Sequence, residues 1–233
     1  MRYKAAILVI LTLVAIGVVS YLEHTRKEAL SKLAPFAEFS VWKRFGLHNL
    51  NTEPGSLFAY PTDIAFQKMP EHPLDIAVVL WKIPGLRSVK INVGEHKVPR
   101  ELLVGVKTAR IKALDLDGAK LGQDLLDELD GTDSIEMLIL TGSDVNTFPK
   151  LSIPKLKELS IGISKLTDQG MKYIFDMSSL EILDISGATI TEISVSDLKR
   201  LTKLSHLYIG DTGISQNNID ELIKAMPNLS VHH

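Results

Sequence analysis

The sequence of 233 residues contains no cysteine. This absence excludes a disulfide-stapled fold, a thiol nucleophile, a cysteine-ligated zinc or iron–sulfur site, and lipid attachment at a cysteine. An excess of one charge is also lacking, because 26 lysines and arginines nearly balance 28 aspartates and glutamates. A balanced chain without clustered basic residues argues against a nucleic-acid partner. Apolar residues make up 45% of the chain, which is enough to bury a core.

Motifs of common enzymes are missing as well. The chain has no Gly-rich phosphate loop, no HExxH zinc motif and no GxSxG nucleophile elbow. The carboxylates of Asp115 and Asp117 are expected to be solvated charges and not acid–base partners. His206, His232 and His233 could meet near the C-terminal end, but no carboxylate spacing supports a metal site there. The sequence therefore predicts no catalytic residue, no cofactor and no metal.

A long uncharged segment, residues 5–22, stands near the N-terminus. As a helix, its 18 residues would reach about 27 Å, close to the thickness of the hydrocarbon core of a bilayer. Arg2 and Lys4 precede it, and positive charge on that flank favours a cytoplasmic N-terminus. We therefore expect residues 1–22 to be a single-pass signal anchor, with one transmembrane helix and the rest of the chain extracytoplasmic. Two alternatives stay open: a cleaved signal peptide, which would leave a secreted or periplasmic protein, and a buried helix of a soluble domain.

Residues 23–85 form a second region of distinct composition. Glu23–Leu33 predicts a short charged helix. Its apolar face would consist of Ala29, Leu30 and Leu33. Six of the ten prolines fall between Pro35 and Pro84, with both tryptophans and five of the seven phenylalanines. Such proline density interrupts regular elements, but so many aromatic residues are not typical of a disordered tether. We expect an irregular, packed capping segment; the alternative is that residues 36–81 hold a ligand cleft or an enzyme site.

From Leu86 onward, a pattern of three aliphatic residues recurs six times at intervals of 21 to 25 residues. Its occurrences are Leu86/Val89/Ile91, Ile111/Leu114/Leu116, Ile135/Leu138/Leu140, Leu156/Leu159/Ile161, Leu180/Leu183/Ile185 and Leu204/Leu207/Ile209. This regularity is typical of a solenoid, in which each unit buries apolar side chains against its neighbours. We expect each triplet to be a short strand, stacked about 4.8 Å from the next in one parallel sheet.

The segments between the triplets are predicted to be mostly helical crossovers. Thr167 or Asp168 would begin one helix, and Ser215 would begin another that Pro227 ends. The crossover at 145–154 is the exception, because its two prolines and a shorter interval leave no room for a helix. We expect an extended or 3₁₀ return there. A tight inward corner should select small residues three positions after each triplet. These residues are Gly94, Ala119, Ser143, Ser164, Ala188 and Thr212.

Four motifs carry a family resemblance. They are LTDQGMKYI at Leu166–Ile174, SSLEILDISGATIT at Ser178–Thr191, TKLSHLYIGDTGIS at Thr202–Ser215 and MPNLSV at Met226–Val231. With them, residues 86–233 resemble a leucine-rich repeat domain, of the bacterial type that is similar to the ribonuclease-inhibitor class. The resemblance implies an α/β solenoid of about six repeats, with a parallel sheet on the concave face and mostly helical crossovers. It also implies binding of proteins or other macromolecules, and no catalysis.

The side chains between the aliphatic residues of each strand should point to the concave surface. Met137, Ile139 and Ile182 would form an apolar spot there, flanked by acidic residues, as at many interfaces. We predict that a protein or other macromolecule binds this surface, with Tyr208 as an aromatic anchor. The residues predicted to contact the partner are Asp115, Met137, Ile139, Glu158, Ile182, Asp184, His206 and Tyr208. The alternative is a solvated sheet face with scattered apolar side chains, in a structural envelope protein without a specific ligand.

Overall fold

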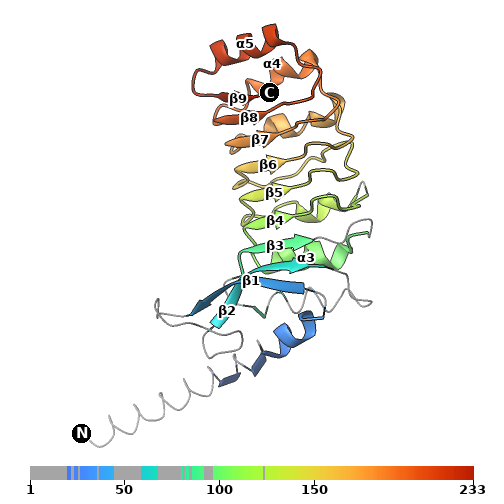
Figure 1. Ribbon diagram of the computed structural model, residues 1–233, viewed down its shortest axis with the longest axis vertical. Coiled ribbons are helices and arrows are strands. Elements are labelled where there is room, and N and C mark those ends of the chain that lie inside the picture. The colour runs from blue at the N-terminus through green and yellow to red at the C-terminus, as the bar shows by residue number, and fades with distance from the viewer. Residues whose placement is uncertain are drawn as a thin grey trace, which may run out of the picture.

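In the computed structural model, nine strands form one sheet whose order follows the chain (Figure 1). The structure describes residues 20–21, 24–25, 27–35, 37–44, 59–67, 80, 82–83, 86–91, 97–122 and 124–233. The strands are β1 (Ala37–Arg44), β2 (Ala59–Phe66), β3 (Ser88–Ile91), β4 (Ala113–Asp115), β5 (Met137–Ile139), β6 (Glu158–Ser160), β7 (Ile182–Asp184), β8 (His206–Tyr208) and β9 (Ser230–His232). The helical elements from residue 97 onward are α3 (Arg100–Thr108), η1 (Leu126–Leu129), η2 (Gln169–Met171), η3 (Ile174–Asp176), η4 (Glu192–Ser194), α4 (Val195–Leu198) and α5 (Gln216–Ala225).

Strands β3 to β9 are the repeats, and they pair in parallel with matching register. The middle aliphatic residue of β5, Leu138, stands opposite its counterpart in β6, Leu159, and the same holds along the sheet. Every aliphatic residue of the six triplets is at most 5% exposed. The predicted stack of parallel strands is therefore confirmed, and each repeat adds its triplet to one continuous apolar core.

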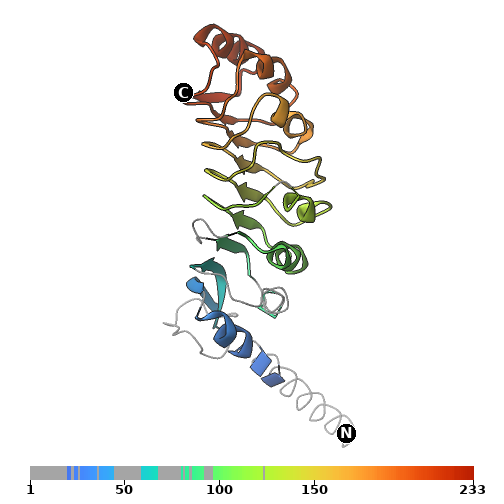
Figure 2. The same cartoon turned by 90° about the vertical axis from the view of Figure 1, so that its right-hand side faces the viewer.

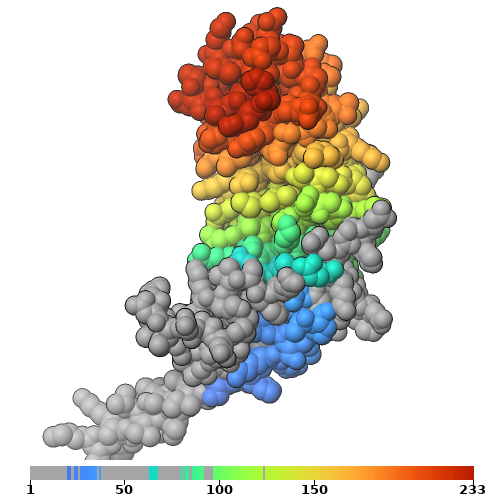
Figure 3. Space-filling view, viewed as in Figure 1, coloured from blue at the N-terminus to red at the C-terminus, as the bar shows by residue number. Residues whose placement is uncertain are grey.

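The sheet lines the inner side of a curved array, and the crossovers form its outer side (Figure 2). Successive repeats lie directly against one another along the length of the array (Figure 3). The core is thus a thin apolar layer between the sheet and the crossovers, and no helix or strand of the described residues covers the other face of the sheet (Figure 2).

Most crossovers contain helical turns, but more of these turns are 3₁₀ than predicted. An α-helix spans residues 216–225 between Ser215 and Pro227, as expected. The helix expected after Thr167 is instead the pair of 3₁₀ turns η2 and η3, with the Gly170 amide donating to Thr167 Oγ1 at 3.3 Å. A 3₁₀ turn rises about 2.0 Å per residue against 1.5 Å in an α-helix, so it spans the outer side with fewer residues. Residues 140–157 contain no helix, in agreement with the return predicted at 145–154.

The region before the repeats contains more regular structure than its composition indicates. Strands β1 and β2 pair antiparallel, and β2 pairs in parallel with β3, with Ile64 opposite Val89. The prediction of an irregular segment does not hold for these two strands. Pro61 lies in β2 but ahead of the residues that pair with β3, which begin at Asp63. Its missing N–H is therefore not needed on that side, which explains how a strand accommodates it.

Two predictions fall largely on residues that the structure does not describe. The signal anchor at 1–22 lies outside the described residues, apart from residues 20 and 21. Most of 36–81, the alternative enzyme site, also lies outside them. In the part of the chain that is described, no helix is long and apolar enough to cross a bilayer. Residues 27–33 are helical, and they bury Ala29, Leu30 and Leu33.

Ser143 and Ser164 occupy the same corner of successive repeats but differ in hydrogen bonding. Ser164 Oγ donates to Ile161 O at 2.6 Å, whereas Ser143 Oγ is buried without a partner among the described residues. We expect Ser143→Ala to raise the free energy of unfolding by about 1 kcal/mol and Ser164→Ala to lower it by a similar amount. Urea denaturation checks both variants. A loss of stability in both would show that the Ser143 hydroxyl has a partner after all.

Asp168 links two successive repeats on the outer side of the array. Its carboxylate accepts hydrogen bonds from the Thr191 amide at 3.1 Å, from Thr191 Oγ1 at 2.8 Å and from Ser194 Oγ at 2.5 Å. Burial by itself raises the pKa of Asp168, but the hydrogen bonds from Ser194 and Thr191 outweigh it. They hold the pKa of this carboxyl below its usual value.

The lowered pKa of Asp168 makes part of the stability dependent on pH. The ionised carboxylate stabilises the fold above its unfolded pKa of about 3.9, and this contribution is lost as the pH falls through the lower folded pKa. We expect Asp168→Asn to lower the free energy of unfolding by about 1–2 kcal/mol at neutral pH. Urea denaturation below about pH 4 should show a shallower further loss in the variant than in the original protein. Parallel pH profiles would contradict this role.

Candidate functional site

Two rows of side chains run across the open face of the sheet. The first precedes the middle aliphatic residue of each strand, and the second follows it. The first row is Ser88, Ala113, Met137, Glu158, Ile182, His206 and Ser230. The second row is Lys90, Asp115, Ile139, Ser160, Asp184, Tyr208 and His232. All eight residues predicted to contact a partner stand in these rows, so the fold brings them to one face. Their role in binding stays a prediction.

The apolar part of this face is less exposed than the sequence suggests. Met137, Ile139 and Ile182 are half-buried, because side chains on strands about 4.8 Å apart cover one another. Tyr208 is more open, at 38% exposed, and His206 beside it is exposed as well. The expected apolar spot is therefore half-buried and divided, because Glu158 and Ser160 of β6 stand between the apolar residues of β5 and β7. An exposed aromatic residue lies toward the C-terminal end.

Hydrogen bonds between neighbouring strands hold the polar side chains of the second row. Ser160 Oγ donates to Asp184 Oδ2 at 3.1 Å and lies 2.6 Å from Thr141 Oγ1, so a chain of bonds crosses β5, β6 and β7. The other oxygen of Asp184 accepts the Ser186 amide at 3.0 Å. Asp115 makes the same bond to the amide two residues on, at 3.1 Å. These carboxylates thus have fixed orientations before any partner arrives.

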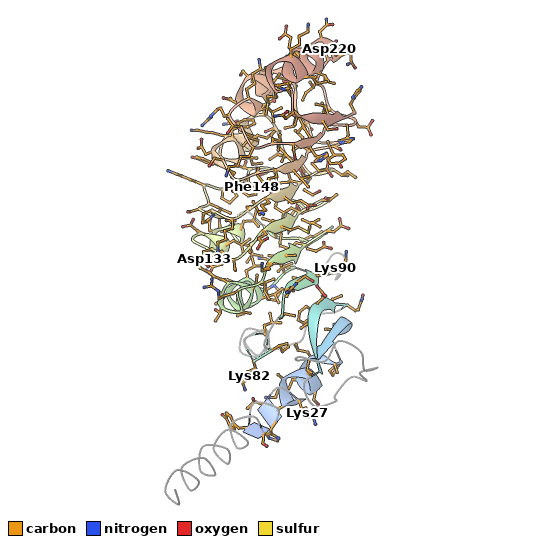
Figure 4. All side chains as sticks on the ribbon, turned by 90° about the vertical axis from the view of Figure 1, so that its left-hand side faces the viewer. Lys27, Lys82, Lys90, Asp133, Phe148 and Asp220 are labelled. Atoms are coloured by element: carbon orange, nitrogen blue, oxygen red, sulfur yellow. The ribbon has the colours of Figure 1, made fainter. Side chains whose placement is uncertain are left out.

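The two ends of the face have different chemistry. Toward the N-terminal end, Lys90 Nζ lies 2.7 Å from Asp115 Oδ2, and this hydrogen bond raises the pKa of the Lys90 ammonium. Toward the C-terminal end, the rings of Tyr208 and His232 stack with centroids 4.3 Å apart, and His206 Nδ1 lies 3.5 Å from His232 Nε2. Figure 4 places Lys90 on the sheet side and Asp133 on the crossover side of the array. In the described residues, no three histidines or carboxylates gather as metal ligands would.

A repeated backbone conformation marks the edge where the strands end. Two residues after each triplet from the second to the sixth, the backbone has a positive φ. The residues are Gly118 (65°), Gly142 (67°), Ile163 (51°), Gly187 (67°) and Asp211 (57°). Ile163, which is 71% exposed, is not among the residues predicted to contact a partner. The glycines at the equivalent positions of three other repeats are the signal that could have identified it.

Comparison with known proteins supports the fold. Residues 154–219 match a family model described as leucine rich repeat. An internalin from Listeria monocytogenes is similar over 66% of this chain and 43% of its own, with 14% identity and a TM-score of 0.54. Internalin C2 from the same organism is similar over 73% of this chain and 80% of its own, with 18% identity and a TM-score of 0.50. This chain thus spans less than half of the first internalin structure. No curated protein matches the sequence.

Proposed function

We propose that this chain, whose residues 154–219 match the leucine rich repeat model, binds a protein partner through its concave sheet face and performs no catalysis. One observation carries this proposal: two aligned rows of side chains stand on an open, curved sheet face, and all eight predicted contact residues belong to them. Solenoids of this kind offer such surfaces for binding. The finer repeat class, similar to the ribonuclease-inhibitor class, rests on the motifs at 166–174, 178–191, 202–215 and 226–231.

The surface suits recognition because little of it has to be ordered when a partner binds. Asp115 and Asp184 are held by neighbouring amides and hydroxyls, and Tyr208 is stacked on His232. Groups that are fixed in advance lose less conformational freedom on association. Half-buried apolar side chains with charged residues among and around them provide both kinds of contact that interfaces use.

Site-specific photocrosslinking in cells tests this function. A photoreactive aromatic amino acid replaces Tyr208 on the concave face, and in a matched control it replaces Ile223 on α5, which is 40% exposed. We expect one dominant protein adduct from position 208 and none of the same mass from position 223. A diffuse set of adducts from both positions would favour the alternative, a structural envelope protein without a specific ligand.

We also propose that residues 5–22 anchor the protein in a membrane, with the repeats on the extracytoplasmic side. The 18 uncharged residues and the preceding Arg2 and Lys4 support this topology. The full-length chain should sediment with membranes, and a variant without residues 5–22 should not. The mass of the N-terminal peptide of the mature protein distinguishes an anchor from a cleaved signal peptide, which would leave the repeats secreted or periplasmic.

A further inference from the structure

Ile163 stands exposed in a backbone conformation that its side chain disfavours. Its φ is 51°, and a β-branched residue rarely adopts a positive φ because the side chain crowds the following carbonyl group. The Ile163 amide donates to Ser186 O at 2.6 Å, which holds the backbone in this conformation. The side chain is nevertheless 71% exposed, so burial within the chain does not offset the strain. Strained backbone positions cluster at functional sites, and an exposed apolar side chain at such a position indicates a surface that a partner covers.

The next repeat leaves room for the Ile163 side chain. Gly187 occupies the equivalent position there, and a Cβ on it would lie 3.3 Å from Ile163 Cγ1. The residue before Ile163 is also a glycine, and a Cβ on Gly162 would lie 3.3 Å from Asp184 Oδ1 and 2.7 Å from Ser186 O. Two residues without side chains therefore surround Ile163, and one of them lies against the Asp184 carboxylate. The edge of the concave face thus has an apolar projection beside a carboxylate.

Among the described residues, most carboxylates of this face do not form an ion pair with a lysine or arginine. Elsewhere, cross-repeat pairs neutralise the charges: Lys112 Nζ lies 2.7 Å from Glu136, and Lys157 Nζ lies 3.8 Å from Glu181. By contrast, within the described ranges no lysine or arginine lies within 4 Å of the carboxylates of the concave face and its edge, apart from the Lys90–Asp115 pair. These carboxylates are Asp117, Glu158, Asp184 and Asp211. A surface of this charge attracts and orients a positively charged partner.

From these observations we propose that the occupant of the concave face is a basic, extended protein segment. One apolar side chain of the segment packs on Ile163, and its lysines or arginines pair with Asp184 and its neighbouring carboxylates. This inference rests on the proposed function and adds the chemistry of the partner. It makes Ile163 an anchor that the structure maintains at a cost in its own stability.

Selection from a displayed library of random 12-residue peptides, with the full chain immobilised, tests the proposal. We expect the enriched peptides to carry more lysine and arginine than aspartate and glutamate. They should bind Ile163→Gly at least about tenfold more weakly than the original chain, and Asp184→Asn several-fold more weakly. The matched control is Ile193→Ser, because Ile193 is 72% exposed but lies in η4 on the outer side and has no positive φ. Its affinity should change less than about twofold.

A second readout separates lost contact from lost folding. Ile163→Gly relieves the positive φ, so its urea midpoint should be equal to or above that of the original chain while its peptide affinity falls. Neutral or acidic peptides that lose affinity on Tyr208→Ala but not on Ile163→Gly would overturn this inference and leave the proposed function standing. A selection that yields no peptide sensitive to either substitution would count against both.

Discussion

An alanine at Gly170 is expected to lower the free energy of unfolding by about 3 kcal/mol or more. A Cβ there would lie 2.3 Å from the carbonyl oxygen of Asn146 and 3.2 Å from Cα of Thr147, both backbone atoms of the preceding repeat. These atoms cannot rotate away as a flexible side chain can. The 3.0 Å hydrogen bond from the Phe148 amide to Gly170 O also joins the two segments, so relief of the clash would stretch it. Urea denaturation followed by circular dichroism gives the loss.

Gly210→Ala is the matched control for this prediction. The nearest atom to a Cβ at Gly210 is Ser186 Oγ, at 3.9 Å, and the backbone there has no positive φ. Alanine should therefore change the free energy of unfolding by less than about 0.5 kcal/mol. If the two variants lost the same stability, the cause would lie in the general preference for glycine and not in the close approach to Asn146.

The second large effect is expected from Phe148→Ala, at about 3–5 kcal/mol of unfolding free energy. Phe148 is fully buried and belongs to the crossover that contains no helix. Other crossovers fill the space behind the sheet with residues from helical turns, such as Leu126 and Ile174. In this crossover the ring of Phe148 fills much of the space behind the sheet. Its removal therefore leaves a large cavity that the flanking repeats cannot close.

Phe148→Leu separates cavity volume from other effects of the substitution. Leucine retains most of the apolar volume, so we expect a loss of no more than about 1.5 kcal/mol by the same urea titration. The m-value should stay unchanged in both variants if each still unfolds in one cooperative step. A loss under about 1 kcal/mol for Phe148→Ala would mean that the outer side of this repeat collapses into the space.

The repeated strands could be predicted because their signal is local and periodic. Each triplet places its own side chains in the core, and the equal spacing tells which strands are neighbours. The strands β1 and β2 carry no such signal. β2 forms a strand because it can pair with the edge of β3. Residues 88–91 supply that edge, so the sequence of residues 59–66 alone does not predict the strand. The choice of 3₁₀ over α in the crossovers depends in the same way on the span between fixed strands.

The same distinction applies to the candidate surface, where the orientation of side chains within a strand could be predicted but contacts between strands could not. Alternation within each strand predicted correctly which side chains face the concave side, including Asp115, Asp184 and Tyr208. It could not predict that Ser160 would tie Asp184 to Thr141, because those three residues meet only through the register of the sheet. Ile163 was missed because residue type alone favours a negative φ there. Only the conformation shared with the glycines of other repeats identifies it.

The order of the strands in the sheet also sets how the chain can assemble. Each parallel pair joins residues about two dozen positions apart, and every described strand pairs only with the strands next to it in the sequence. Closing such short loops costs little entropy, and the cost is the same for every pair. Folding can therefore spread outward from any repeat that forms first. A local fault such as a clash behind β6 therefore acts first on the contact between the two repeats that meet there.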